Sequence, residues 1–133
     1  ILHGVHEQVD FMGWKNFEEM QTYFGEADIC LIPHMKSDHT DSTVPHKLFQ
    51  YMYAQKPTIA SNCVPLERII NQTQCGLIYS NNDSIAFSKC IQKLSEDSEL
   101  KINMQQNGFD AVRDKYNWDN DSKYLQDLYN ELA

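Results

Sequence analysis

The sequence predicts an α/β fold, a Rossmann-like parallel sheet with flanking helices. Short apolar runs at residues 27–32, 58–60 and 75–79 alternate with longer segments whose apolar residues recur at helical spacing. The run 27–32 is apolar at nearly every position, which is typical of a strand that is buried on both faces of a parallel sheet. A chain of 133 residues is long enough for one domain with a core, so residues 1–133 are expected to form a single domain.

The expected elements begin with a strand at residues 9–12, which Gly13 ends. Asn16 can cap the next helix, and Gly25 is a natural stop for it. A sheet of about four strands is expected, with the last helix packing back across the domain. The later elements are expected in this order: strand 27–32, polar loop 34–44, helix 45–52, strand 58–60, helix 64–70, strand 75–79, helices 85–94 and 98–115, and an amphipathic helix over 117–132.

Composition excludes several classes of function. The formal net charge is −8 and the sequence is acidic, with a pI of about 4.9, whereas a general nucleic-acid surface requires a basic face. The four cysteines are widely spaced with no CxxC pair, which favours free thiols in a reducing cytoplasm over disulfides or zinc. His34, His39 and His46 have the spacing of a loop rather than of a zinc motif. No metal and no cofactor are therefore expected.

The stretch STVPHKL has the chemistry of an anion site. Pro45 suits the first turn of a helix, whose first N–H groups have no internal partner and carry the positive end of the dipole. Two hydroxyl groups and one lysine add donors, so the loop could hold a phosphate or diphosphate. The alternative is a capped helix start with a solvated lysine. The candidate residues are Ser42, Thr43, Val44, Pro45, His46 and Lys47.

Four segments in order, VDFMGW, MQTYFGEADICLIP, STVPHKLFQYMYAQKPTIAS and CGLIYSNND, resemble the C-terminal half of GT-B glycosyltransferases. The resemblance is to the retaining family-four (group 1) enzymes, and it runs from about Val9 to the C-terminus, where Trp118 matches a late tryptophan. It implies a nucleotide-sugar donor, which is a substrate and not a cofactor. It also implies transfer of a sugar to a glycan or lipid-linked acceptor.

The resemblance implies roles for individual residues. The loop 42–47 would approach the donor diphosphate through backbone N–H groups and Lys47. Gln50 stands where the family usually has a glutamate that accepts hydrogen bonds from the ribose, and Ser42 stands at a second glutamate that meets the sugar. Both carboxylates are absent, and a neutral acceptor makes weaker bonds than an ionised one. Gln55 replaces a helix-ending glycine, a position that favours the left-handed conformation.

Three further residues have open interpretations. Gly13 and Trp14 would lie near the nucleotide base, where the indole could stack on the base or simply cover the core. His34 could face the sugar or be a solvated loop residue. None of these residues is expected to act as a general base.

The resemblance also implies that this chain lacks an N-terminal domain and the first strands of its own domain. We therefore expect a donor-binding half-domain of a cytoplasmic transferase, whose parent could lie at the inner face of a membrane through its acceptor. The fragment alone is expected to be inactive and to self-associate through its uncovered apolar edge. The alternatives are a non-catalytic binding or scaffold module and a sugar-nucleotide epimerase relative.

Overall fold

The computed structural model of the chain describes residues 4–132 and contains one parallel sheet. Its three strands are β1 (Cys30–Ile32), β2 (Thr58–Ser61) and β3 (Gly76–Tyr79), in the order β1-β2-β3. Thr58 of the central strand lies opposite Cys30 on one side and Gly76 on the other. The predicted α/β class with a parallel sheet is confirmed.

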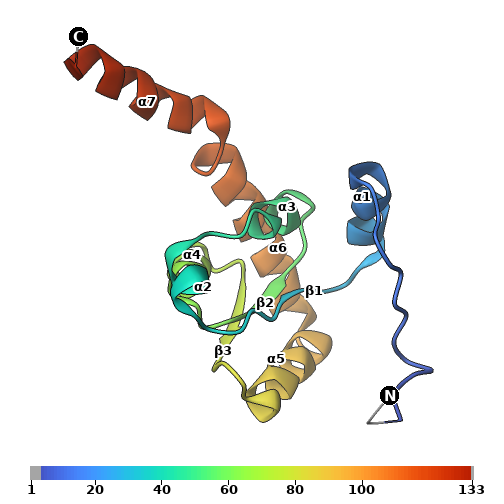
Figure 1. Cartoon of the computed structure of the whole chain (residues 1–133). Coiled ribbons are helices and arrows are strands. Elements are labelled where there is room, and N and C mark those ends of the chain that lie inside the picture. Colours follow the sequence, from blue (N-terminus) through green and yellow to red (C-terminus); the bar gives the residue numbers. More distant parts are fainter. Residues whose placement is uncertain (1–3, 133) are drawn as a thin grey trace.

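Seven helices are assigned among the described residues, and Figure 1 shows how they are arranged relative to the sheet. They are α1 (Phe17–Glu26), α2 (Asp38–Ser42), α3 (Lys47–Tyr53), α4 (Val64–Thr73), α5 (Ser84–Glu96), α6 (Ser98–Asp114) and α7 (Trp118–Leu132). No helix within residues 4–132 is both long enough and apolar enough to cross a membrane.

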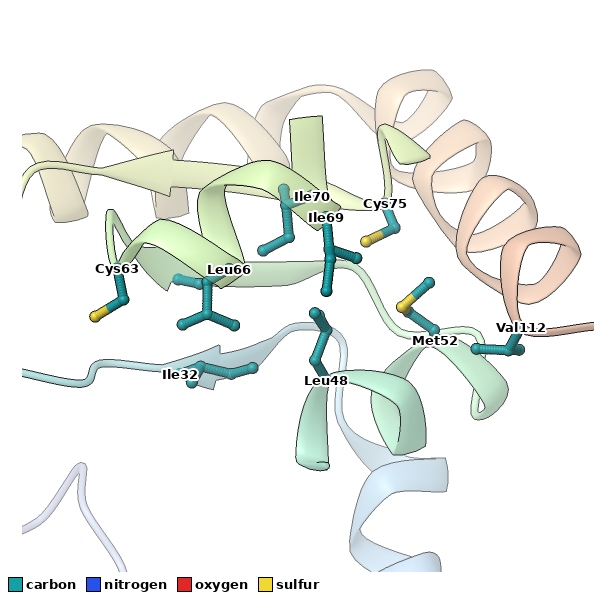
Figure 2. Packing of buried hydrophobic residues seen from close by; sticks show 10 residues of the cluster. Ile32, Leu48, Met52, Cys63, Leu66, Ile69, Ile70, Cys75 and Val112 are labelled. Atoms are coloured by element: carbon teal, nitrogen blue, oxygen red, sulfur yellow. The ribbon is translucent and has the colours of Figure 1, made fainter. Parts of the chain in front are cut away.

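One face of the sheet packs against α3 and α4. In Figure 2, Leu48 of α3 points toward Ile69 of α4, and Met52 lies between Cys75 and Val112. Val112 comes from the end of α6, which therefore reaches around to this face. The buried members of this cluster are Ile32, Leu48, Met52, Ala60, Cys63, Leu66, Ile69, Ile70, Cys75 and Val112.

The other face of the sheet packs against α5 and α6. Ile59 of β2 meets Leu94 of α5 and Met104 of α6 in a second buried cluster. Because consecutive side chains of a strand point to opposite faces, Ile59 and Ala60 serve the two clusters in turn. Every residue of β2 is buried, so the sheet is a middle layer between helices.

The cysteines are free thiols, as predicted. Three of them are buried, and burial raises the pKa of the Cys30 thiol to about 11. A buried thiol with a raised pKa is an inert packing group rather than a nucleophile.

The strand predicted at residues 9–12 is wrong. These residues form no strand, and Phe11 is 91% exposed. The alternating pattern is present, but a strand also needs a neighbour to pair its N–H and C=O groups. The described sheet supplies no such neighbour, so it has three strands rather than about four.

The strand predicted at 27–32 is shorter than expected and is not buried on both faces. Only residues 30–32 are paired, and Leu31 is 38% exposed. The reason is position, since β1 is an edge strand and only β2 has a neighbour on each side. The prediction of full burial applies to β2 instead.

The last helix does not pack back across the domain, contrary to prediction. It extends away from the body of the protein in Figure 1, and none of its residues is buried. Trp118 of its apolar face is 70% exposed. An amphipathic pattern predicts that a helix has an apolar face but does not say what covers it.

Several helix ends differ from their predictions. Asn16 does cap α1, in a capping box with Glu19, but the helix runs through Gly25 to Glu26. The loop predicted at 34–44 contains the short helix α2. The helix expected from Pro45 begins two residues later, at Lys47. Gln55 adopts the left-handed conformation, with φ of 55°.

Candidate functional site

The carboxyl edge of the sheet is held together by one backbone carbonyl. The carbonyl oxygen of His34, just after β1, accepts hydrogen bonds from Ser61 Oγ at 2.7 Å and from Asn81 Nδ2 at 2.8 Å. Asn81 also donates its backbone N–H to Asn62 Oδ1 at 2.8 Å. These bonds join the chain segments that leave all three strands, at the edge where α/β proteins bind ligands.

Helix α4 begins at this edge, and its N-terminus is already occupied. Asp41 of α2 accepts a hydrogen bond from Val64 N at 2.9 Å, so a carboxylate of the protein caps the helix. Lys36 lies 3.9 Å from Asp41 and donates to the carbonyl of Asn62 at 3.3 Å. An external anion would have to compete with Asp41 there, so the start of α4 is a poor anion site.

The two hydroxyl groups before α3 are exposed and bond back to the local backbone. Ser42 Oγ donates to the carbonyl oxygen of His39 at 3.0 Å, and Thr43 Oγ1 donates to the same oxygen at 2.8 Å. Val44 packs against the cluster between the sheet and α3. With their protons used in the protein, the two hydroxyl oxygens can accept hydrogen bonds from a ligand but do not donate to one.

The start of α3 presents a lysine. The first turn is made by bonds from Leu48 N to the carbonyl of Pro45 (3.1 Å) and from Gln50 N to that of His46 (3.2 Å). His46 makes no side-chain cap. Lys47 is exposed, and no carboxylate among residues 4–132 forms an ion pair with it.

A charge interaction links Lys47 to His34, which lies just after β1. Burial lowers the pKa of the His34 imidazole below its usual range, and the charges of Lys47 and His39 lower it further. The imidazole is therefore neutral at pH 7. Lys36 is paired with Asp41 at this edge, whereas Lys47 forms no ion pair with a carboxylate among residues 4–132.

Gln50 lies one turn along α3 from Lys47. It is half-buried and lines a hollow of about 220 Å³ with Phe17 and Phe24 of α1. It also lines a second hollow, of about 400 Å³, with His46 and with Trp118 at the start of α7. Its side chain is thus available to a ligand that lies across the start of α3.

The two residues proposed near a nucleotide base lie apart from this group. Gly13 has a positive φ of 66°, and Trp14 is 88% exposed. Neither residue lines a hollow that contains Gln50. The structure brings the loop 42–47 and Gln50 together but does not bring Gly13 and Trp14 to them.

Sequence reasoning missed the residues that hold the edge in place. Ser61, Asn62 and Asn81 each follow a predicted strand, so their positions at strand ends were visible. The capping role of Asp41 had no comparable sequence signal, because it depends on a contact between α2 and α4.

Comparison with known proteins gives consistent results. The family model for glycosyl transferases group 1 matches residues 2–111. An uncharacterized glycosyltransferase of Methanocaldococcus jannaschii is 27% identical over 128 residues, which are 95% of this chain and 31% of that protein. A D-inositol 3-phosphate glycosyltransferase of Corynebacterium kroppenstedtii is 21% identical over 128 residues, 96% of this chain and 27% of that protein.

A solved structure shares the fold. Sucrose-phosphate synthase from Thermosynechococcus elongatus superposes with a TM-score of 0.82 at 22% identity, over 96% of this chain and 31% of that one. The chain thus spans less than a third of the length of each of these relatives.

Proposed function

This chain belongs to the glycosyl transferases group 1 family, and on that premise we propose that it is the donor-binding part of a retaining glycosyltransferase. Its substrate is a nucleotide sugar, and the whole enzyme transfers the sugar to a glycan or lipid-linked acceptor. Residues 1–133 form one domain of that enzyme, which works in the cytoplasm together with an N-terminal domain. Nucleic acid is not a partner, in keeping with the net charge of −8.

Lys47, which forms no ion pair among residues 4–132, carries this proposal. Its ammonium group and the backbone N–H groups at the start of α3 form a seat for the donor diphosphate. The sheet edge favours this role, because parallel α/β sheets bind ligands beyond the carboxyl ends of their strands. A phosphate there also meets the positive end of the helix dipole.

The hydrogen bonds that Ser42 and Thr43 donate to His39 decide the role that we assign to their hydroxyl groups. Ser42 and Thr43 accept hydrogen bonds from the hydroxyl groups of the transferred sugar, since their own protons go to His39. Val44, Pro45 and His46 shape the backbone that faces the diphosphate.

Gln50 completes the donor site in this proposal. Residues three apart on a helix are neighbours on its surface, so Gln50 lies beside Lys47. Its amide oxygen accepts a hydrogen bond from a ribose hydroxyl while Lys47 holds the phosphates. Gly13 and Trp14 would meet the nucleobase once the segment before α1 lies over the bound nucleotide.

Catalysis in the whole enzyme then rests on positioning and on electrostatic stabilisation of the departing nucleoside diphosphate. Lys47 is the residue placed to stabilise that charge. With Ser42 and Gln50 at the two family carboxylate positions, the donor sugar is held by neutral hydrogen bonds.

Calorimetric titration tests the proposal. Uridine and guanosine diphosphates are titrated into the full-length protein and into Lys47→Ala and Gln50→Ala variants. Lys47→Ala should cost about 1.5–3 kcal/mol of binding free energy, the contribution of a charge-assisted hydrogen bond, and Gln50→Ala less. Lys89→Ala is the matched control, because Lys89 is an exposed residue of α5 and its loss removes the same charge away from the site. Equal affinity of wild type and Lys47→Ala would refute the donor site.

A second candidate is a non-catalytic nucleotide-binding module, favoured by the absence of both carboxylates at positions 42 and 50. This candidate predicts diphosphate binding without consumption of any nucleotide sugar by the full-length protein. The double variant Ser42→Glu with Gln50→Glu puts a glutamate at both family positions. Sugar transfer by this variant, but not by the wild type, would show that an activity was lost through these two positions.

A further inference from the structure

Helix α7 carries an apolar face that no other part of residues 4–132 covers. Its members are spaced by three, four or seven residues, so they lie on one side of the helix. Each of them is at least 46% exposed. Single exposed apolar residues are ordinary, but a contiguous patch marks a contact with another surface. The α7 apolar face consists of Trp118, Leu125, Leu128, Tyr129 and Leu132.

One side chain sets the direction in which α7 leaves the domain. Asn117 Nδ2 donates to the carbonyl oxygens of Val112 at 3.2 Å and Arg113 at 2.8 Å, at the end of α6. Asn117 Oδ1 accepts a hydrogen bond from Asn120 N at 2.9 Å, in the first turn of α7. Asn120 Nδ2 in turn donates to the carbonyl oxygen of Asp114 at 2.9 Å. These bonds define the angle between α6 and α7, at which α7 extends away from the body in Figure 1.

The inner end of the α7 apolar face lies at the start of α3. Trp118 lines the hollow of about 400 Å³ together with His46 and Gln50. Phe49 and Tyr116 line the same hollow, with ring centroids 5.3 Å apart. A partner that covers the α7 apolar face therefore also lies beside the first turn of α3.

Charge argues against a second copy of α7 as that partner. The helix has four carboxylates and one lysine, a net charge of −3, so two such helices side by side repel each other. Asp121 is three residues from Trp118 and four from Leu125, so it lies on the same side as the apolar face. A pair of α7 helices would bring two of these carboxylates into one apolar interface. The face fits an apolar surface that has lysine or arginine side chains at its edge.

The lengths of the relatives indicate where such a surface is found. The superposition on sucrose-phosphate synthase covers 96% of this chain but 31% of that one. Because α7 has 15 of the 133 residues, the superposed part includes most of α7. The two curated relatives also extend well beyond the matched part. A surface on the same polypeptide has a high effective concentration, which favours it over a separate protein.

We propose that the α7 apolar face binds the N-terminal part of the full-length protein, at an apolar surface with basic side chains along its edge. The contact rests on the proposed function only in that it takes this part to be the N-terminal domain named there. It does not require a donor at Lys47. Asn117 sets the angle at which the bound part lies beside the start of α3.

Hydrogen–deuterium exchange of the full-length protein tests this contact. A 15-residue helix with no covered face is marginally stable in water, so its amides exchange slowly only when the face is covered. Leu128→Glu should speed exchange of residues 118–132 by about tenfold or more, the loss expected when a leucine is no longer buried. Asn130→Glu is the matched control, because it adds the same charge to the opposite side of the same helix.

Slow exchange in the wild type that Leu128→Glu speeds, but Asn130→Glu does not, supports the contact. Fast exchange in the wild type, or equal effects of the two variants, overturns it. Protection of α7 that disappears on dilution also overturns it, because a second copy would then cover the face.

Two further measurements keep the test decisive. Unchanged exchange in β2 shows that Leu128→Glu still folds, and if it does not, Leu128→Ala is judged by the same outcomes. Titration of uridine diphosphate into wild type and Lys47→Ala decides the donor site separately. Failure of that titration leaves the exchange result standing, so the two proposals fail independently.

Discussion

Replacing Gly76 with alanine should destabilise the sheet through one backbone contact. Gly76 begins β3 directly opposite Thr58 of the central strand. A Cβ added at Gly76 would lie 2.0 Å from the carbonyl oxygen of Thr58 and 2.9 Å from its carbonyl carbon. Ordinary contacts are about 3.5–4.0 Å, so the two strands would have to separate by more than about 1 Å.

The magnitude follows from what must move. Extra methyl groups in a packed core cost about 1–3 kcal/mol when flexible side chains can adjust. Here the obstacle is the backbone of a fully buried strand, and separation also strains the bond from Thr58 N to the carbonyl of Cys75, now 3.2 Å. We expect Gly76→Ala to lower the free energy of unfolding by about 3 kcal/mol, a large part of a typical total of about 5–15 kcal/mol.

Urea unfolding followed by circular dichroism measures this loss. Gly25→Ala is the matched control, because its added Cβ meets nothing within 4 Å in α1. Alanine is the better helix former, so the control should be unchanged or more stable by up to about 1 kcal/mol. A loss of less than about 0.5 kcal/mol for Gly76→Ala would show that β2 and β3 are not packed as closely as described.

Three further predictions concern other parts of the chain. Asp41→Ala should cost about 0.5–2 kcal/mol of stability in urea, because it uncaps Val64 N, whereas Asp38→Ala should cost less; equal losses would contradict the capping role. Removal of residues 118–132 should change the free energy of unfolding by less than about 1 kcal/mol, because α7 buries no residue; a larger loss would show that α7 packs on the domain. The pKa of His34 is lowered from 6.5, so the unfolded chain binds the proton more readily and stability falls as the pH drops below 6.5. His34→Gln should reduce that fall in unfolding titrations between about pH 7 and 5, and an identical pH profile would exclude His34 as its source.

Local patterns correctly predicted those elements whose stabilising contacts or defining residue pattern lie within a short stretch of the sequence. The capping box of Asn16 and Glu19 depends only on residues three apart, and it is present. The apolar run around Ile59 predicted the central strand correctly. Gln55, which is left-handed, stands where the resembling family has a helix-ending glycine. Such features follow from backbone geometry and spacing, which the sequence contains directly.

The candidate site was only partly visible in the sequence. The residue types of the loop 42–47 indicated an anion site, but not that both hydroxyl groups donate to the carbonyl of His39. The sequence likewise did not show that α2 supplies Asp41 to cap α4. These bonds depend on how the loop turns and on which segments meet, and neither is encoded in a short window of residues.

The sequence by itself determined the alternation of strands with amphipathic helices, and therefore the α/β class. Only the tertiary structure decided which apolar surfaces are covered. Phe11 and Trp118 belong to patterns as regular as those in the core, yet both side chains are exposed. The physical reason is that burial and strand pairing are properties of two segments together, and the described residues offer these two segments no partner.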